Sequence, residues 1–381
     1  MNHKKIEILG LSLACESSGG GRKAVGEDAF WAVAQELVRG NVTGILTIGN
    51  HMEGYLDQTP ILRYTVANNR WTKTRVSLPK EYMQKPWIGA SLTLTKEGSA
   101  LICSANDKVQ DEMAFICHIE FMQPSGPIKT AMFENLPEED AIEYAARSNA
   151  SLVTLHDGHI LRLGGRVRPE MYGGNQPLAH NAIYDPSKKP FEMPRFTNQL
   201  SDILGRRQSF PQGEWSALDF RTDLPWGMFC IVLQDNNVLI TGGIHTRPSG
   251  EHTRDVCFMY FTATKKITRV KEMTSPRAFH SGCLLPSGRV FVCGGVRASL
   301  QKALTCEEYN PATGEWTQLA AELIPRMGHS CVLMVSGEVL ILGGWDVEQR
   351  CELYNPTTGL VKEAAPIPVK MSGFQVIPIG E

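Results

Sequence analysis

Arginine and tryptophan residues at recurring positions are the strongest candidates for chemistry in this sequence. Arg277 and Arg326 each follow a proline and stand three residues before a histidine, in PRAFHS and PRMGHS. Related positions in less regular segments hold Trp87, Arg147 and Trp226. A guanidinium pairs with carboxylates through parallel hydrogen bonds, and an indole supplies apolar contact area. These residue types therefore favour non-covalent recognition of a partner.

Motifs for catalysis and metal binding are missing or incomplete in the sequence. The chain has no G-x-S-x-G sequence, no CxxC pair and no cysteine–histidine group with zinc-finger spacing. The glycine run at 19–21 lacks the Gly-Lys-Ser/Thr ending of a phosphate-binding loop. His156 and His159 flank Asp157-Gly158, which is typical of a hairpin turn. We therefore expect no catalytic residue, no metal site and no cofactor.

The recurring positions belong to a repeat of about fifty residues. Diglycine pairs begin at Gly242, Gly294 and Gly343, which are 52 and 49 residues apart. Around each pair, two apolar runs are joined by a short turn, which predicts a β-hairpin. A Tyr-containing segment and a further apolar run follow, which makes four expected strands per unit. One such sheet has no core of its own, so neighbouring units must stack.

This pattern resembles the kelch repeat in its Pro-Arg and following His, its diglycine, and its spaced Tyr and Trp. The resemblance implies an all-β fold, a kelch-type β-propeller in which four-stranded blades surround a central channel. The match is strong over two units and degenerate over four more; the ranges are 276–365, then 30–71, 85–120, 144–186 and 225–273.

The two ends of the chain leave the blade count at six or seven. Residues 366–380 align with a first strand, and residues 4–11 align with a second strand. We expect these N- and C-terminal strands to pair and to close the ring, either as an abbreviated blade or as part of an existing one. The chain is then a single propeller domain over 1–381, with a polar loop at 14–29 and an insertion at 191–224.

The resemblance also implies a binding face. In kelch propellers the segment before each first strand and the loop after each second strand open on the same face. The residues expected to bind a partner there are Trp87, Arg147, Arg166, Arg168, Trp226, Arg247, Arg277, Arg297 and Arg326. The alternative for each arginine is an internal pair with a carboxylate of the neighbouring blade or with a backbone carbonyl. We expect His280 and His329 to form structural hydrogen bonds.

The favoured function is a non-enzymatic protein-interaction module or scaffold, of the kind used as an adaptor in cytoskeletal or ubiquitin-linked assemblies. Its expected ligand is an acidic peptide or an acidic surface of a protein partner. The alternative is a kelch-type enzyme or sugar-binding protein, similar to sialic acid mutarotases, with an Arg/Glu/His group at the channel mouth. An iron site similar to that of plant specifier proteins is incomplete, because Met259 stands where the histidine ligand is needed.

The composition limits the classes of partner that the protein can bind and indicates its cellular compartment. With 38 Lys+Arg against 40 Asp+Glu, the chain has no general attraction to nucleic acid or anionic membranes. No apolar run reaches the length of a membrane span. The ten cysteines mostly lie in apolar runs, which is typical of buried thiols in a reducing compartment. A secretion signal is the alternative for residues 4–15, but Glu7 interrupts the apolar stretch and a strand is favoured. We expect a cytoplasmic protein that binds neither nucleic acid nor membranes.

Overall fold

The described part of the chain is built almost entirely of β-strands. The computed structural model describes residues 3–8, 11–16, 44–51, 60–77, 91–94, 100–104, 115–121, 128–135, 150–165, 181–187, 214–218, 222, 224–247, 250–297, 301–345, 347–368 and 371–379. Within these ranges the one helical element is a short 3-10 turn, Val66–Asn68. No described helix has the length and apolar character needed to cross a membrane. The predicted all-β class is confirmed.

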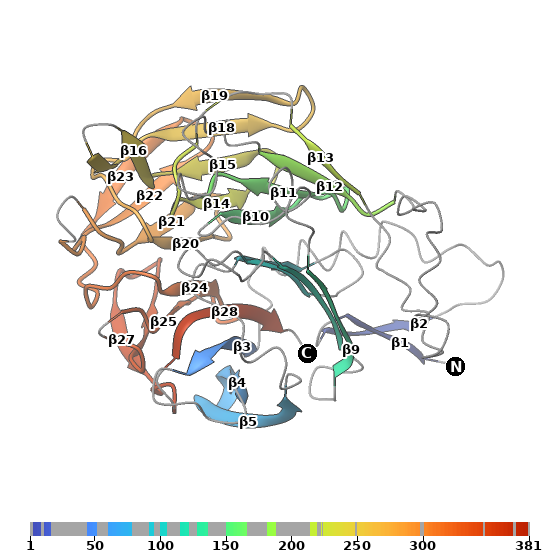
Figure 1. The fold of residues 1–381 in the computed structure, drawn as a ribbon. Coiled ribbons are helices and arrows are strands. Elements are labelled where there is room, and N and C mark those ends of the chain that lie inside the picture. Colours follow the sequence, from blue (N-terminus) through green and yellow to red (C-terminus); the bar gives the residue numbers. More distant parts are fainter. Residues whose placement is uncertain are drawn as a thin grey trace, which may run out of the picture.

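Four consecutive antiparallel meanders form the best-described part of the fold (Figure 1). In each, the strands follow one another from first to fourth. Their bounds are β10 (Ser151–Thr154), β11 (Ile160–Leu163), β12 (Ala182–Asp185) and β13 (Glu214–Ala217); β14 (Phe229–Val232), β15 (Val238–Thr241), β18 (Cys257–Phe261) and β19 (Lys266–Val270); β20 (Ser281–Leu284), β21 (Val290–Cys293), β22 (Cys306–Asn310) and β23 (Glu315–Leu319); β24 (Ser330–Leu333), β25 (Val339–Leu342), β26 (Cys351–Tyr354) and β27 (Val361–Ala364).

Two further four-stranded sheets and two hairpins complete the described elements. One sheet contains β6 (Ser91–Leu94), β7 (Ala100–Ser104), β8 (Phe115–Phe121) and β9 (Ile128–Asn135). The other joins both ends of the chain, in the order β28 (Met371–Ile379), β3 (Gly44–His51), β4 (Pro60–Thr65) and β5 (Arg70–Ser77). The hairpins are β1 (His3–Ile8) with β2 (Leu11–Glu16), and β16 (Ile244–Arg247) with β17 (Gly250–Thr253).

The sheets are arranged like the blades of a propeller. Their first strands neighbour one another in the cycle β6, β10, β14, β20, β24 and β28, and β28 lies beside β6 again. Figure 1 shows the fourth strands β19, β27 and β5 at the periphery and the first strands β14, β24 and β28 nearer the centre. Consecutive meanders therefore surround a common axis, as the repeat predicts.

The ring closes with a different strand from the one predicted. The C-terminal strand β28 is a first strand, as expected, but it pairs with β3 and not with residues 4–11. Residues 3–8 pair instead with residues 11–16 in a local hairpin. Only two residues separate those strands, so the local pairing has a far smaller loop-closure cost than pairing with the other end of the chain. The N- and C-terminal strands thus form no additional blade within the described residues.

The structure describes part of each of the two segments predicted outside the repeat. Residues 14–16 of the predicted loop 14–29 belong to β2, and the remainder lies outside the described residues. In the insertion 191–224, residues 214–217 form β13, the fourth strand of its sheet. That correction follows from pairing, because β13 completes the meander beside β12. Residues 191–213 lie outside the described part of the chain.

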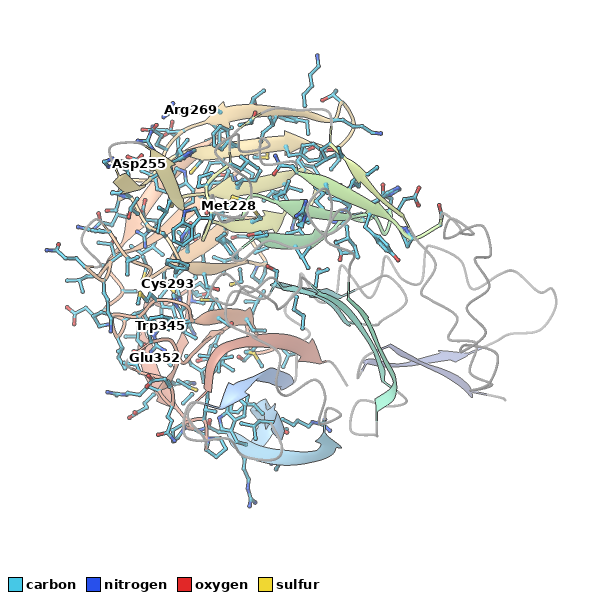
Figure 2. The ribbon with its side chains drawn as sticks, viewed as in Figure 1. Met228, Asp255, Arg269, Cys293, Trp345 and Glu352 are labelled. Carbon is cyan, nitrogen blue, oxygen red and sulfur yellow. The ribbon has the colours of Figure 1, made fainter. Side chains whose placement is uncertain are left out.

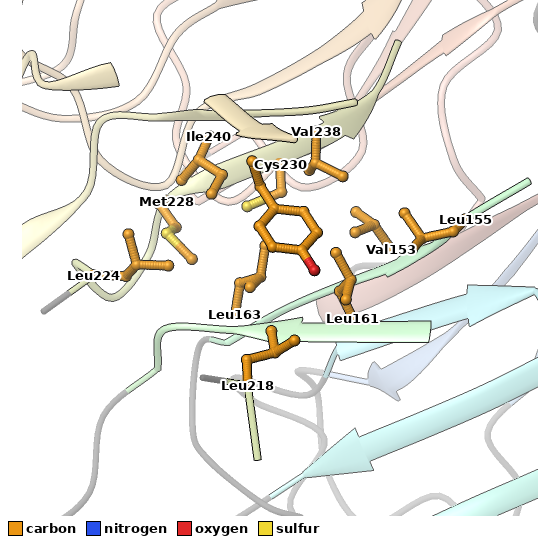
Figure 3. Packing of buried hydrophobic residues seen from close by; sticks show 11 residues of the cluster. Val153, Leu155, Leu161, Leu163, Leu218, Leu224, Met228, Cys230, Val238 and Ile240 are labelled. Carbon is orange, nitrogen blue, oxygen red and sulfur yellow. The ribbon is translucent and has the colours of Figure 1, made fainter. Parts of the chain in front are cut away.

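The hydrophobic core lies between successive sheets. Second strands β11, β15, β21 and β25 are buried at every position, because neighbouring sheets cover both of their faces. Figure 3 shows one such layer, in which β10 and β11 face β14 and β15. Its members include Val153, Leu161, Leu163, Met228, Cys230, Val238 and Ile240. Each fully buried aliphatic side chain contributes about 1.5–3 kcal/mol, so stacking supplies the core that a single sheet lacks.

The repeated tyrosine and tryptophan connect one sheet to the sheet before it. The Tyr309 and Trp316 rings lie 5.1 Å apart, and the Trp316 indole N–H donates to the carbonyl of Lys271 over 3.0 Å. Trp71 makes the same bond, of 2.9 Å, to the carbonyl of Ala365. These two residues are 294 positions apart in the sequence, so this bond ties the two ends of the chain together at the point of closure.

Candidate functional site

Arg277 occupies a fully buried position inside its own sheet. Its side chain has an exposed fraction of 0% and forms an ion pair with Glu307 on β22, with Nη2 2.5 Å from Oε1. Nη1 donates to the carbonyl oxygens of Gly294 and Thr305 over 3.0 and 2.8 Å. The other Glu307 oxygen accepts the backbone N–H of Thr274 at 2.6 Å. The guanidinium therefore joins the start of the first strand, the diglycine and the third strand.

Arg326 makes the equivalent contacts in the next sheet. It is 1% exposed and pairs with Glu352 on β26, and its Nη1 donates to the carbonyls of Gly343 and Arg350 over 2.7 and 3.0 Å. Ile324 N–H donates to the same glutamate over 3.2 Å. The predicted role of Arg277 and Arg326 in partner binding is wrong, because both guanidinium groups are buried and bonded internally. The alternative of internal bonds is correct for the backbone carbonyls, but the carboxylate that each arginine pairs with lies in the same sheet and not in the neighbouring blade.

The glutamates were missed in the sequence, although the repeat marks them. Glu307 and Glu352 each follow a cysteine and stand two residues before a tyrosine, in CEEY and CELY. In the preceding sheet the position of the glutamate is Phe258, and the position of the arginine is Pro225. Both charges are therefore replaced together in that sheet. A buried charge without its partner is costly, so the paired replacement is the signal that identifies an internal ion pair.

The diglycine allows the next sheet to pack on these arginine segments. Gly294 has a φ of +62°, and a Cβ there would lie 2.6 Å from the carbonyl oxygen of Arg326. The N–H of Gly295 donates to that same oxygen over 2.8 Å. We call the edge of the ring that carries the diglycine pairs the diglycine face. The opposite edge carries the hairpin turns at 334–338 and 355–360, and we call it the turn face.

Trp226 has a different repeat position from the one predicted. It forms an isolated β-bridge with Ile244, just as Ala278 does with Val296, so it corresponds to Ala278 and not to Arg277. Its ring packs edge-on against Phe279, with centroids 5.5 Å apart. The offset arises because the proline beside it, not the tryptophan, takes the place of the arginine.

An apolar patch surrounds Trp226 on the diglycine face. Ile244, Ala278 and Val296 form a buried base, and Trp226, Phe279 and Met327 pack on it while remaining partly exposed. Trp345, which follows the third diglycine, is 50% exposed, and its backbone N–H donates to the carbonyl of Met327 over 2.9 Å. Figure 2 labels this tryptophan among the side chains of the sheets β20–β27. We call Trp226, Phe279, Met327 and Trp345 the aromatic patch.

Cationic side chains lie next to the aromatic patch. Arg297 is half-buried, and its Nη2 donates to Ser275 Oγ over 3.1 Å. Lys302 Nζ donates to the carbonyl of Trp345 over 3.3 Å. Arg247 ends β16, and its side chain is outside the described set. The remaining predicted residues lie outside the described residues; they are Trp87, Arg147, Arg166 and Arg168.

The repeated histidines form the predicted hydrogen bonds. His280 Nε2 lies 2.8 Å from Thr241 Oγ1, and His329 Nε2 lies 3.4 Å from Cys293 Sγ. Burial, followed by the charge of a nearby arginine, lowers the pKa of both imidazoles, well below 6.5 for His280 and to about 3 for His329. Both rings are therefore neutral near pH 7. His159 lies beside Asp157 at the hairpin turn, as predicted.

A cluster of soft donor atoms lies where two sheets meet, and the sequence patterns did not predict it. Cys293 Sγ, His329 Nε2 and Cys331 Sγ are all within 4.8 Å of one another. The three residues come from the end of β21, the segment before β24 and β24 itself, so no short spacing motif connects them. Met259, by contrast, is buried in the core, which does not favour the incomplete iron site.

The chain matches no protein-family model and no curated protein.

Proposed function

We propose that this protein is a non-enzymatic kelch-type propeller of six blades that binds a protein partner through the aromatic patch. The observation that carries the proposal is the half-exposed side chain of Trp345 on the diglycine face, whose backbone N–H bonds the carbonyl of Met327. Aromatic side chains on a rigid base are typical centres of binding energy in protein interfaces. Propellers present such surfaces on loops fixed by a stable ring.

The kelch assignment is supported by what each repeated residue does. The arginine bonds the diglycine carbonyl, the histidine bonds the second strand of the preceding sheet, and the tryptophan bonds the carbonyl that ends that sheet. Six four-stranded sheets among the described residues, with neighbouring first strands in a closed cycle, support six blades. The kelch features are thus internal contacts that hold blades together, which leaves binding to the residues between them.

The partner we propose carries an apolar anchor flanked by carboxylates. The indole of Trp345 and the ring of Phe279 would contact the anchor. Lys302, whose Nζ donates to the carbonyl of Trp345, would pair with an acidic group beside it, and Arg297, which follows Val296 of the buried base, would supply the second cation. The acidic ligand expected from the sequence is retained, but its cations are at the rim of the patch and not at Arg277 and Arg326. A reducing compartment such as the cytoplasm suits the free thiols of the seven cysteines whose side chains the structure describes.

A mutarotase-like enzyme receives no specific support from the described residues. The Arg/Glu pairs that such a site would need are Arg277 with Glu307 and Arg326 with Glu352, and both are buried in internal bonds. Their donors and acceptors connect backbone segments and leave little capacity for a substrate.

Affinity capture with matched surface variants tests the proposed function. Trp345→Ala removes the central side chain of the patch, whereas Leu360→Ala removes an equally apolar side chain on the turn face that is 70% exposed. We expect Trp345→Ala to lower recovery of the specific partner at least about tenfold, as loss of an interface hot spot does, and Leu360→Ala to leave it unchanged. Equal recovery by both variants, measured by quantitative mass spectrometry at matched thermal stability, would contradict the assignment.

A further inference from the structure

We propose that Cys293, His329 and Cys331 form a zinc-binding site at the junction of the sheets β20–β23 and β24–β27. Cys293 ends the second strand of one sheet, and Cys331 lies on the first strand of the next. Cys293 is 1% exposed and His329 6% exposed, while Cys331 is half-buried. Two thiols and an imidazole are the donor set that zinc prefers in proteins.

The separation of the donor atoms fits one small ion. Cys293 Sγ lies 3.5 Å from Cys331 Sγ and 3.4 Å from His329 Nε2. A tetrahedral zinc ion with Zn–S bonds of about 2.3 Å and a Zn–N bond of about 2.0 Å sets its ligand atoms roughly 3.5–3.8 Å apart. Both of these separations are close to the edges of such a tetrahedron, and the third, between Cys331 and His329, is within 4.8 Å. A disulfide would instead require the two sulfur atoms to approach to about 2.05 Å.

The charge of the site suits its burial. Zinc binding displaces one proton from each thiol to solvent, and two thiolates with a neutral imidazole then balance the +2 charge of the ion. A neutral complex avoids the large cost of an unpaired charge in an apolar environment. Cys331 is the more accessible ligand, so the open fourth position and the path for the ion lie on its side.

The preceding junction, where β15 of one sheet meets β20 of the next, shows that the fold does not need these thiols. There Thr241 takes the place of Cys293 and bonds His280 over 2.8 Å, so the hydrogen bond to histidine is common to both sheets. Gly282 takes the place of Cys331, as the second residue of the first strand. Only the junction after β21 combines two thiols with the histidine among the described residues.

The repeat therefore supplies substitutions that remove ligands but keep the local structure. Cys293→Thr retains a hydrogen-bond partner for His329, and Cys331→Gly copies the neighbouring sheet. Cys230→Gly is the matched control, because Cys230 is also the second residue of a first strand, and the residue that corresponds to Cys293 at its junction is Leu163, which has no thiol. Far-UV circular dichroism of each metal-free variant verifies that it folds.

The experiment uses the full-length protein, reduced, treated with a chelator and then titrated with Zn²⁺ or Co²⁺. We expect about one equivalent of zinc by elemental analysis, a thiolate-to-cobalt charge-transfer band with Co²⁺, and a rise in Tm of a few degrees with zinc. Cys293→Thr and Cys331→Gly should lose all three effects, and Cys230→Gly should keep them. The proposal is overturned if the wild-type protein shows neither the stoichiometric uptake nor the cobalt band, or if the two ligand variants bind as the wild type does.

Discussion

At the scale of single residues, the repeated charges stabilise the fold. Arg277 and Glu307 are both completely buried and join three segments of one sheet, and Arg326 and Glu352 do the same in the next. Removal of one partner leaves the other charge without compensation in the interior. Variants at these arginines therefore report on stability and not on binding.

Arg277→Met is expected to lower the free energy of unfolding by about 3–5 kcal/mol, because Glu307 is left buried and unpaired. The double variant Arg277→Met/Glu307→Met removes both charges, as the neighbouring sheet does with Pro225 and Phe258, and should recover most of that loss. Urea denaturation of the four proteins in this double-mutant cycle measures the coupling. Additive losses would show that the two side chains are not an energetic pair.

The buried histidines make stability depend on pH. The native pKa of His280 is lowered by burial first, then by Arg277 and His329, so the unfolded chain takes up a proton below about pH 6.5 that the native state does not. Stability is therefore complete above that pH and falls as the pH decreases, by about 1.4 kcal/mol per unit for each such histidine. We expect a lower urea midpoint at pH 5.5 than at pH 7.5.

His280→Met provides the control for this pH dependence, because Met228 takes the same repeat position in the preceding sheet. Its difference in urea midpoint between pH 7.5 and 5.5 should be smaller than that of the wild type. An unchanged difference would mean that His280 does not titrate between the two states in the predicted way.

At the scale of elements, the sequence predicts the strands better than their partners. Apolar runs, tight turns and the diglycine predicted the hairpins around Gly242, Gly294 and Gly343, which the structure contains. The closing pair was wrong, because a strand pattern records which face is apolar and not which distant strand it meets. The position of Trp226 was wrong for a related reason, since a one-residue offset is invisible without the β-bridge that fixes it.

Closure of the ring by β28 is testable by deletion. Removing residues 371–381 deprives β3 of one of its two neighbouring strands and exposes the side of the adjacent sheets, so we expect a marked fall in Tm and a less cooperative transition. Deletion of residues 1–16 removes the separate hairpin β1–β2 and should have a much smaller effect. Thermal unfolding followed by circular dichroism compares them, and an equal loss in both would contradict this role for β28.

At the scale of the whole molecule, a near-zero net charge is compatible with one strongly cationic face. The described part of the chain, however, contains no exposed ring of arginines. Of the seven arginines expected on that face, Arg277 and Arg326 are internal, and the described part of the diglycine face presents aromatic side chains with Lys302 beside them. The spacing of the arginines could not distinguish these cases, because a buried and an exposed arginine have the same spacing in the repeat. Only the joint replacement of the arginine and the glutamate in the preceding sheet indicates an internal pair. The exposure of Trp345 depends on the conformation of the loop after β25, and no pattern of residue types in the sequence predicts it.

The most direct measurement of the central claim is hydrogen–deuterium exchange of the full-length protein with and without its captured partner. The account predicts slower exchange, on binding, in the segments around Trp226, Phe279, Met327 and Trp345, and unchanged exchange at the hairpin turns 334–338 and 355–360. Protection confined to the turn face, with the aromatic patch unaffected, would contradict it.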